Sequence, residues 1–176
     1  MGGPPPPPPP VIPIDSVEEA KSSVAASTAA LEATVERIGT LTDAERAQNV
    51  NGEWLAIESL RHIVFVIDVW LSKTIQGEDD PFHPIGIPPH FVPRKLPGSS
   101  IDPDATPTFE EVVEALRGRF ATLEHYVNES PAAELERSIG THAKTVGGGL
   151  SVIITELDAH NYFINRDLDI IEGERG

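Results

Sequence analysis

The sequence contains no cysteine, which excludes disulfide bonds, a thiol nucleophile, and zinc or iron–sulfur sites that use cysteine ligands. It also lacks any apolar run of the roughly 18–20 residues that a membrane-spanning helix requires. The first residues show neither the basic region nor the apolar helix of a secretory signal. We therefore expect a cytoplasmic protein without a membrane partner.

Basic residues are scarce, with 13 Lys and Arg against 28 Asp and Glu, which gives a formal net charge of -15. Nucleic-acid binding requires a basic surface that displaces counterions from phosphates, so this balance excludes a nucleic-acid partner. Docking on an anionic membrane is disfavoured for the same reason. Over 176 residues, 39% hydrophobic and 23% charged residues are typical of one folded globular domain rather than a disordered chain.

Proline is abundant, but it is concentrated in two places. The run Pro4–Pro10 predicts an extended polyproline II segment, because each proline fixes φ and lacks an N–H. We expect residues 1–14 to be a solvated, disordered tail, with a ligand for a proline-binding module as the alternative reading. Residues 15–176 would then form the folded domain.

The second proline-rich segment, residues 77–107, is predicted to be irregular because eight prolines interrupt it. An irregular loop of this length within a compact domain is typical of a lid or binding loop. It carries His83 and His90, which we consider as acid–base groups at the mouth of a pocket.

Helical spacing of apolar residues, as in the stripe Val24, Leu31 and Val35, predicts helices over residues 16–38, 53–75, 108–128 and 150–172. The sequence from Thr108 to Glu111 matches a capping box at the start of the third helix. We expect Gly39 to end the first helix from the C′ position, and the glycines at 147–149 to break the chain before the last helix. The predicted fold is all-α, a four-helix bundle with a long crossover between helices 2 and 3 and no strand.

The last predicted helix carries Glu156 and His160 one turn apart, so the two side chains point the same way. His62 lies on the most apolar helix, and burying such groups costs several kcal/mol unless they are paired or bind a metal. His62, Glu156 and His160 could together hold a divalent cation and leave coordination positions open. Zinc is our first choice of metal, with Ni, Fe or Mn as alternatives.

Simpler readings exist for each of these residues. A histidine on an apolar helix is often a hydrogen-bonded core residue, and Glu156 with His160 could be an ordinary surface pair. Glu58, one turn before His62, either orients its imidazole or is an exposed helix residue. We place Asp158 and Asp167 outside the set of ligands, and expect Asp167 to pair with Arg166. His125 and His142 are expected to be surface or loop histidines.

Several short motifs resemble the DinB-like superfamily, and in particular its branch of mycothiol-dependent maleylpyruvate isomerases. They are Asn51-Gly52-Glu53-Trp54, Leu60-Arg61-His62, Phe82-His83-Pro84, Glu156-Leu157-x-x-His160 and Arg166-Asp167-Leu168, and the likeness covers most of residues 15–172 without the proline tail. The resemblance implies a four-helix bundle that holds a divalent metal through one histidine of the second helix and two ligands of the last. Those positions correspond to His62, Glu156 and His160.

The resemblance also implies a metal-dependent enzyme acting on a small molecule, as a low-molecular-weight-thiol transferase or isomerase, or as a hydrolase. A low-molecular-weight thiol is then a candidate cosubstrate. The alternative is a non-catalytic helical module that binds a metal or a partner. Bundles of this kind often pair through exposed helix faces, so a homodimer is a further expectation.

Overall fold

The computed structural model describes residues 13–175, and most of the expected tail, residues 1–12, lies outside them. The elements in chain order are α1 Val17–Gly39, α2 Asp43–Arg46, α3 Ala56–Ile67, the π-helix η1 Asp68–Ile75, α4 Phe109–Glu129, the 3-10 helix η2 Ala132–Glu136 and α5 Val146–Gly173. The described part contains no strand beyond one isolated bridge between Ser138 and Thr145. None of its helices combines the length and apolar character needed to cross a bilayer.

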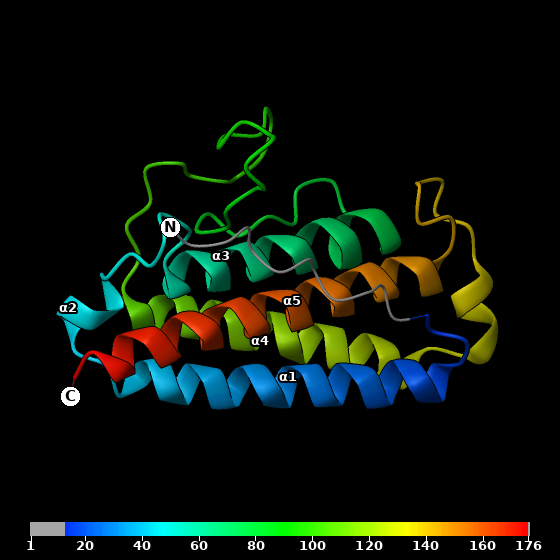
Figure 1. The fold of residues 1–176 in the computed structure, drawn as a ribbon. Coiled ribbons are helices and arrows are strands. Elements are labelled where there is room, and N and C mark those ends of the chain that lie inside the picture. The colour runs from blue at the N-terminus through cyan, green and yellow to red at the C-terminus, as the bar shows by residue number, and fades with distance from the viewer. Residues whose placement is uncertain (1–12, 176) are drawn as a thin grey trace.

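The four long helices lie side by side as a bundle (Figure 1). α1 and α3 each pack against both α4 and α5. α1 therefore lies at the corner of the bundle opposite α3, and α4 lies opposite α5. In Figure 1, α1 and α5 run toward one end of the bundle, whereas α3 and α4 run toward the other. Because α3 and α4 are parallel, residues 76–108 must return along the bundle between them. This arrangement confirms the predicted four-helix bundle with a long crossover.

The first helix follows its predicted apolar pattern. Val24 and Leu31 are fully buried, and the Ser16 hydroxyl caps the helix by accepting the Glu19 N–H at 3.1 Å. The expectation that Gly39 sits beyond the helix end is wrong, because Gly39 is its last residue and lacks a left-handed φ. Thr40 follows with a right-handed helical conformation, so no left-handed cap is needed there.

The second helix begins three residues later than predicted, at Ala56. Asn51 and Gly52 form a left-handed turn, with φ of 57° and 73°, and the Leu55 N–H is accepted by the Glu58 carboxylate at 2.9 Å. Trp54 therefore lies before the helix rather than inside it. From Asp68 to Ile75 the helix widens to the i→i+5 pattern of a π-helix, a feature that is common near functional sites.

The last helix begins at Val146, so the expectation that the three glycines break the chain before it is wrong. They form its first turn, and the Thr145 hydroxyl accepts the Gly148 N–H at 3.2 Å. A Cβ at Gly148 would lie 2.0 Å from the Ala143 carbonyl oxygen. Glycine is present because the entering chain approaches the helix backbone too closely for any side chain.

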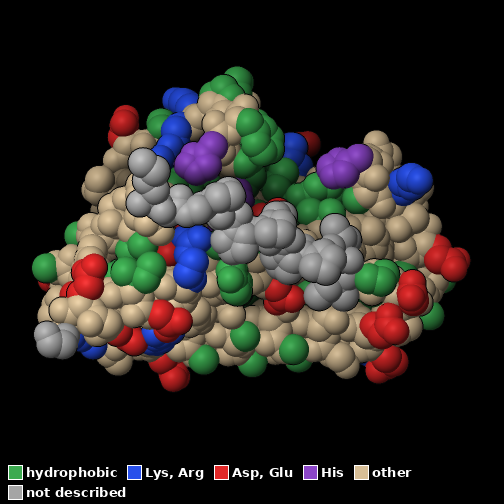
Figure 2. All heavy atoms as spheres, viewed as in Figure 1, with side chains coloured by type: hydrophobic (Ala, Val, Ile, Leu, Met, Phe, Trp, Pro, Cys, Tyr) green, Lys and Arg blue, Asp and Glu red, His purple; other side chains and the backbone are tan. Residues whose placement is uncertain are grey.

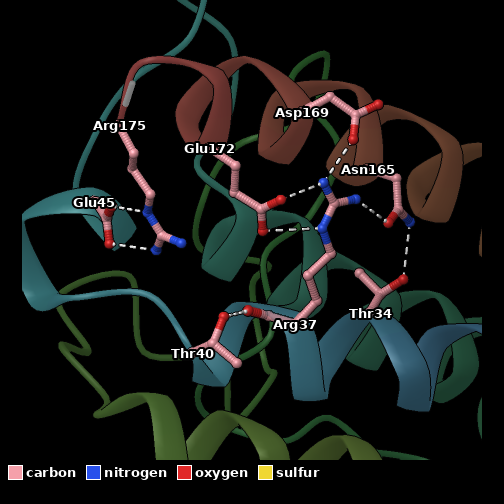
Figure 3. Close-up of polar contacts among 8 residues, drawn as sticks. All are labelled: Thr34, Arg37, Thr40, Glu45, Asn165, Asp169, Glu172 and Arg175. Atoms are coloured by element: carbon pink, nitrogen blue, oxygen red, sulfur yellow. Dashed lines mark hydrogen bonds and ion pairs between the residues drawn. The ribbon is translucent and has the colours of Figure 1, made fainter.

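The connections contain more structure than their polar sequences predict, since α2 and η2 lie within them. The capping box before α4 is confirmed, with the Thr108 N–H donated to Glu111 at 2.7 Å and the Glu111 N–H to the Thr108 hydroxyl at 3.2 Å. At the far end of the bundle, Arg37 of α1 donates to Glu172 and Asp169 of α5 (Figure 3). These ion pairs hold the C-terminal ends of α1 and α5 together.

The crossover is attached to the bundle by buried polar contacts. Asp68 is only 1% exposed, and it accepts hydrogen bonds from the Arg119 guanidinium at 2.5 Å and from the His83 N–H at 2.9 Å. The Arg61 guanidinium donates to the Ile85 carbonyl at 2.7 Å. The irregular segment is therefore packed against α3 and α4, where it can contribute fixed groups to a site.

Candidate metal centre and adjoining pocket

The structure brings together the three residues that the sequence singles out. His62 on α3 and His160 on α5 direct their Nε2 atoms at the same carboxylate oxygen of Glu156, at 3.7 Å and 3.4 Å. One ligand atom from each of the three residues lies within 4.8 Å of the others. Two imidazoles and one carboxylate at this spacing could hold a metal ion, because small shifts of the side chains would surround a common point.

The orientation of His62 fits a metal ligand. Its Nδ1–H donates to the Ile87 carbonyl at 2.8 Å, which fixes the tautomer and leaves the Nε2 lone pair facing Glu156 and His160. Metal-binding histidines commonly donate their other ring N–H in this way. The carbonyl comes from the crossover, so the packed loop determines which nitrogen of His62 is available.

The carboxylate of Glu156 is ionised near neutral pH. The pKa of its carboxyl group is lowered to about 2, chiefly by the neighbouring His160 and next by His62. An ionised oxygen ligand flanked by two nitrogen ligands is compatible with zinc, and also with nickel, iron or manganese. The donor set therefore fits the cation expected from the sequence.

The cluster lies in the wall of a pocket of about 620 Å³ between α3, η1 and α5, with the crossover over one end. The Trp54 ring is centred 4.8 Å from His62 and 4.3 Å from His90, so it lies against the cluster and the crossover histidine. His90 and its neighbour Phe91 are exposed at the rim. Figure 2 shows histidine side chains on either side of a hollow on this face of the molecule.

The other end of the pocket is aromatic and aliphatic. Trp70 of η1 packs edge-on against His142, with 5.2 Å between the ring centroids. Val69 beside it and Val152 of α5 continue the lining toward the cluster. The pocket thus runs from a polar end with three ligand atoms to an apolar end bounded by Trp70 and His142.

Other titratable residues singled out in the sequence lie outside the cluster. Glu58 contacts the Leu55 N–H and Arg94 instead of His62, so it acts at the start of α3. His83 lines a separate pocket beside Arg119, and burial lowers its pKa. His125 is exposed on α4.

The two acidic residues excluded from the ligand set have other partners. Asp158 accepts a hydrogen bond from Ser27 at 2.6 Å, and Asp167 pairs with Arg166 at 2.7 Å, as expected. Asp167 also borders the pocket, which its position in the helix does not predict.

Trp54, His142 and the Ile87 carbonyl contribute to the site without having been predicted. The Asn51-Gly52 turn was the available signal for Trp54, because it places the tryptophan before the helix rather than within it. The positions of His142 and Ile87 depend on how two irregular segments fold onto the bundle, and no local pattern encodes that.

Comparison with known proteins gives one family and no individual relative. No curated protein and no solved structure matches the chain. The sequence model of the DinB superfamily matches residues 5–164, beginning inside the proline run rather than after it. The match spans most of the chain and includes all three residues of the cluster. The chain therefore belongs to the DinB superfamily.

Proposed function

We propose that this protein is a divalent-metal-dependent enzyme that acts on a small molecule. The observation that carries the proposal is the convergence of His62, Glu156 and His160 in the wall of a pocket that opens to solvent. A purely structural metal site is normally closed by four protein ligands, whereas three ligands beside a pocket leave room for a substrate.

The three residues would hold zinc, with nickel, iron or manganese as alternatives. When bound, such a cation supplies Lewis acidity toward a thiol, a carbonyl or water. The rest of the pocket contributes binding: Trp54 excludes water above the cluster, and the apolar lining holds the body of the ligand. His90, exposed at the rim and 4.3 Å from Trp54 between ring centroids, is the nearer of the two predicted acid–base groups.

The reaction class that we favour is transfer or isomerisation with a low-molecular-weight thiol. Hydrolysis of a small substrate is our second choice. The resemblance of the chain's motifs to the branch of mycothiol-dependent isomerases supports the thiol chemistry, and the open coordination positions are compatible with both reactions. A homodimer formed through exposed helix faces is part of the proposal, and sedimentation analysis tests it separately.

Elemental analysis and metal titration of single variants test the metal centre. His160→Ala and Glu156→Gln should each lower zinc affinity by more than the roughly 10–100-fold that loss of a supporting hydrogen bond causes, because each removes a ligand. His125→Ala is the matched control, since it removes an exposed histidine of α4. Absence of stoichiometric zinc in the native protein, or equal affinity in all three variants, contradicts the metal centre.

A turnover assay tests the enzymatic part. With zinc bound, the native protein and His125→Ala should process thiol and ester substrates, and His160→Ala should not. Stoichiometric zinc without any turnover would instead favour the non-catalytic metal-binding module.

A further inference from the structure

The pocket is lined by acidic side chains and by no lysine or arginine among the described residues. The acidic side chains are Glu53, Glu156 and Asp167. Residues 1–12, which are outside that description, contain no Lys or Arg in the sequence. An anionic group on a ligand would therefore meet no lysine or arginine among the described residues that line the pocket.

The guanidinium of Arg166, whose two carboxylate partners line the pocket, is already neutralised. The Arg166 guanidinium pairs with Asp167 at 2.7 Å and also with Glu53, and it lies 5.2 Å from the centre of the Phe163 ring. Two carboxylates around one guanidinium leave this group of charges negative. Arg166 is therefore held by two carboxylates of the pocket wall, and drawing it away toward a ligand anion would leave a carboxylate unpaired there.

The apolar end offers no compensation either. Val69, Trp70 and Val152 line it, and the ring of His142 packs edge-on against Trp70. A carboxylate or phosphate placed there would lose its hydration without gaining a lysine or arginine partner among the described lining residues, at a cost that rises as the pocket excludes water. The acidic surface of the whole chain, with a net charge of -15, opposes the same ligands at a distance.

We propose that the pocket selects ligands whose body is uncharged and apolar, and which carry their single metal-binding group at one end. The ligand would place a thiol, carbonyl or hydroxyl group at His62, Glu156 and His160, and an aromatic or aliphatic body between Val152 and Trp70. Substrates with a second anionic group, such as dicarboxylates and phosphate esters, are rejected. That the ligand's thiol, carbonyl or hydroxyl group binds at the three-residue cluster rests on the proposed function.

The two tryptophans of the chain report directly on this pocket, because Trp54 and Trp70 line its opposite ends. Binding can therefore be followed by intrinsic fluorescence in the native protein. Trp54→Phe and Trp70→Phe each leave a single reporter, at the apolar end and at the cluster end respectively. A ligand that spans the pocket should change the emission of both variants.

Three related thiols test the selectivity: benzyl mercaptan, methyl 4-(mercaptomethyl)benzoate and 4-(mercaptomethyl)benzoate. The first two have uncharged bodies, and the third differs from the ester by exposing a carboxylate. We expect the carboxylate to bind about tenfold to a hundredfold more weakly than the ester, given the interaction energies of a charge in a partly dry site. Equal binding of ester and carboxylate overturns the proposal, as does failure of both uncharged thiols to bind.

A charge introduced at the apolar end should reverse this order. Val152 precedes Glu156 by one turn of α5 and lines the pocket, so Val152→Lys places an ammonium group where the ligand carboxylate would lie. It should gain affinity for the carboxylate, while Val152→Met, of similar length without charge, should not. Val69→Lys on the opposite wall provides a second variant should the first fail to fold. No gain in either lysine variant contradicts the inference.

Zinc titration of the same samples separates this inference from the proposed function. If zinc does not bind, the metal-dependent function fails, and the comparison of ester with carboxylate on zinc-free protein still decides the selectivity. If zinc binds and the carboxylate binds as well as the ester, the metal centre stands and the selectivity is wrong.

Discussion

At the scale of single residues, the ion pair between Asp68 and Arg119 is a buried contact whose loss should be costly. Asp68 is 1% exposed, so removing its partner leaves a buried carboxylate whose remaining donor, among residues 13–175, is the His83 N–H. Arg119→Ala should therefore lower the free energy of unfolding by about 3 kcal/mol, measured by urea denaturation at neutral pH. Arg117→Ala is the control on the same helix.

The control removes an exposed pair with Glu32, and surface pairs contribute at most about 1 kcal/mol. A loss for Arg119→Ala no larger than that of Arg117→Ala would show that the buried pair does not stabilise the fold.

The same pair has a defined pH dependence. Burial raises the pKa of Asp68 above its ordinary value of 3.8, and the hydrogen bond from Arg119 only partly opposes this. A carboxyl whose pKa is higher in the folded state stabilises the protein when protonated, and that contribution is lost as pH rises through the folded-state pKa. The loss in free energy of unfolding caused by Arg119→Ala should therefore shrink as the pH falls toward 3.8. A loss that stays constant with pH would show that it arises from packing rather than from charge.

At the scale of elements, replacing either of two helical glycines by alanine should change the stability of the protein, in opposite directions. Gly148→Ala should destabilise the protein by about 1–3 kcal/mol, because its Cβ would lie 2.0 Å from the Ala143 carbonyl oxygen at the start of α5. Gly118→Ala, in the exposed middle of α4 with no atom within 4 Å of a new Cβ, should stabilise it by about 1 kcal/mol. Thermal or urea unfolding measures both. Stabilisation by Gly148→Ala would refute the close approach.

These elements also show what a sequence can and cannot predict. The capping box at Thr108 and the apolar stripe of α1 are local patterns, and both were predicted correctly. The glycines at 147–149 were misread because their role depends on a chain segment that folds back onto α5. His62 and Glu156 were selected from helical spacing and family resemblance, and the bundle brings them together. Trp54 in the pocket depends on tertiary packing, which periodicity does not encode.

At the scale of the whole molecule, a bound metal should stabilise the fold by mass action. Zinc at a hundred times its dissociation constant would add about 2.7 kcal/mol to the free energy of unfolding. For a domain of this size, each kcal/mol corresponds to about 2–4 °C in Tm, so we expect zinc to raise Tm by about 5–10 °C. Differential scanning calorimetry with and without chelator measures the shift. His62→Ala should abolish it, and an equal shift in that variant would place the zinc elsewhere.

The cluster joins residues that are nearly a hundred positions apart in the chain, since His62 lies on α3 and His160 on α5, with the crossover and α4 between them. Contacts so distant in sequence close only after most of the bundle has formed. A cation that bridges them would then be absent from the folding transition state, so it would slow unfolding without speeding folding. In this protein, metal supply would act on the lifetime of the native state: molecules that have acquired a cation would persist, while metal-free copies would continue to open and reclose.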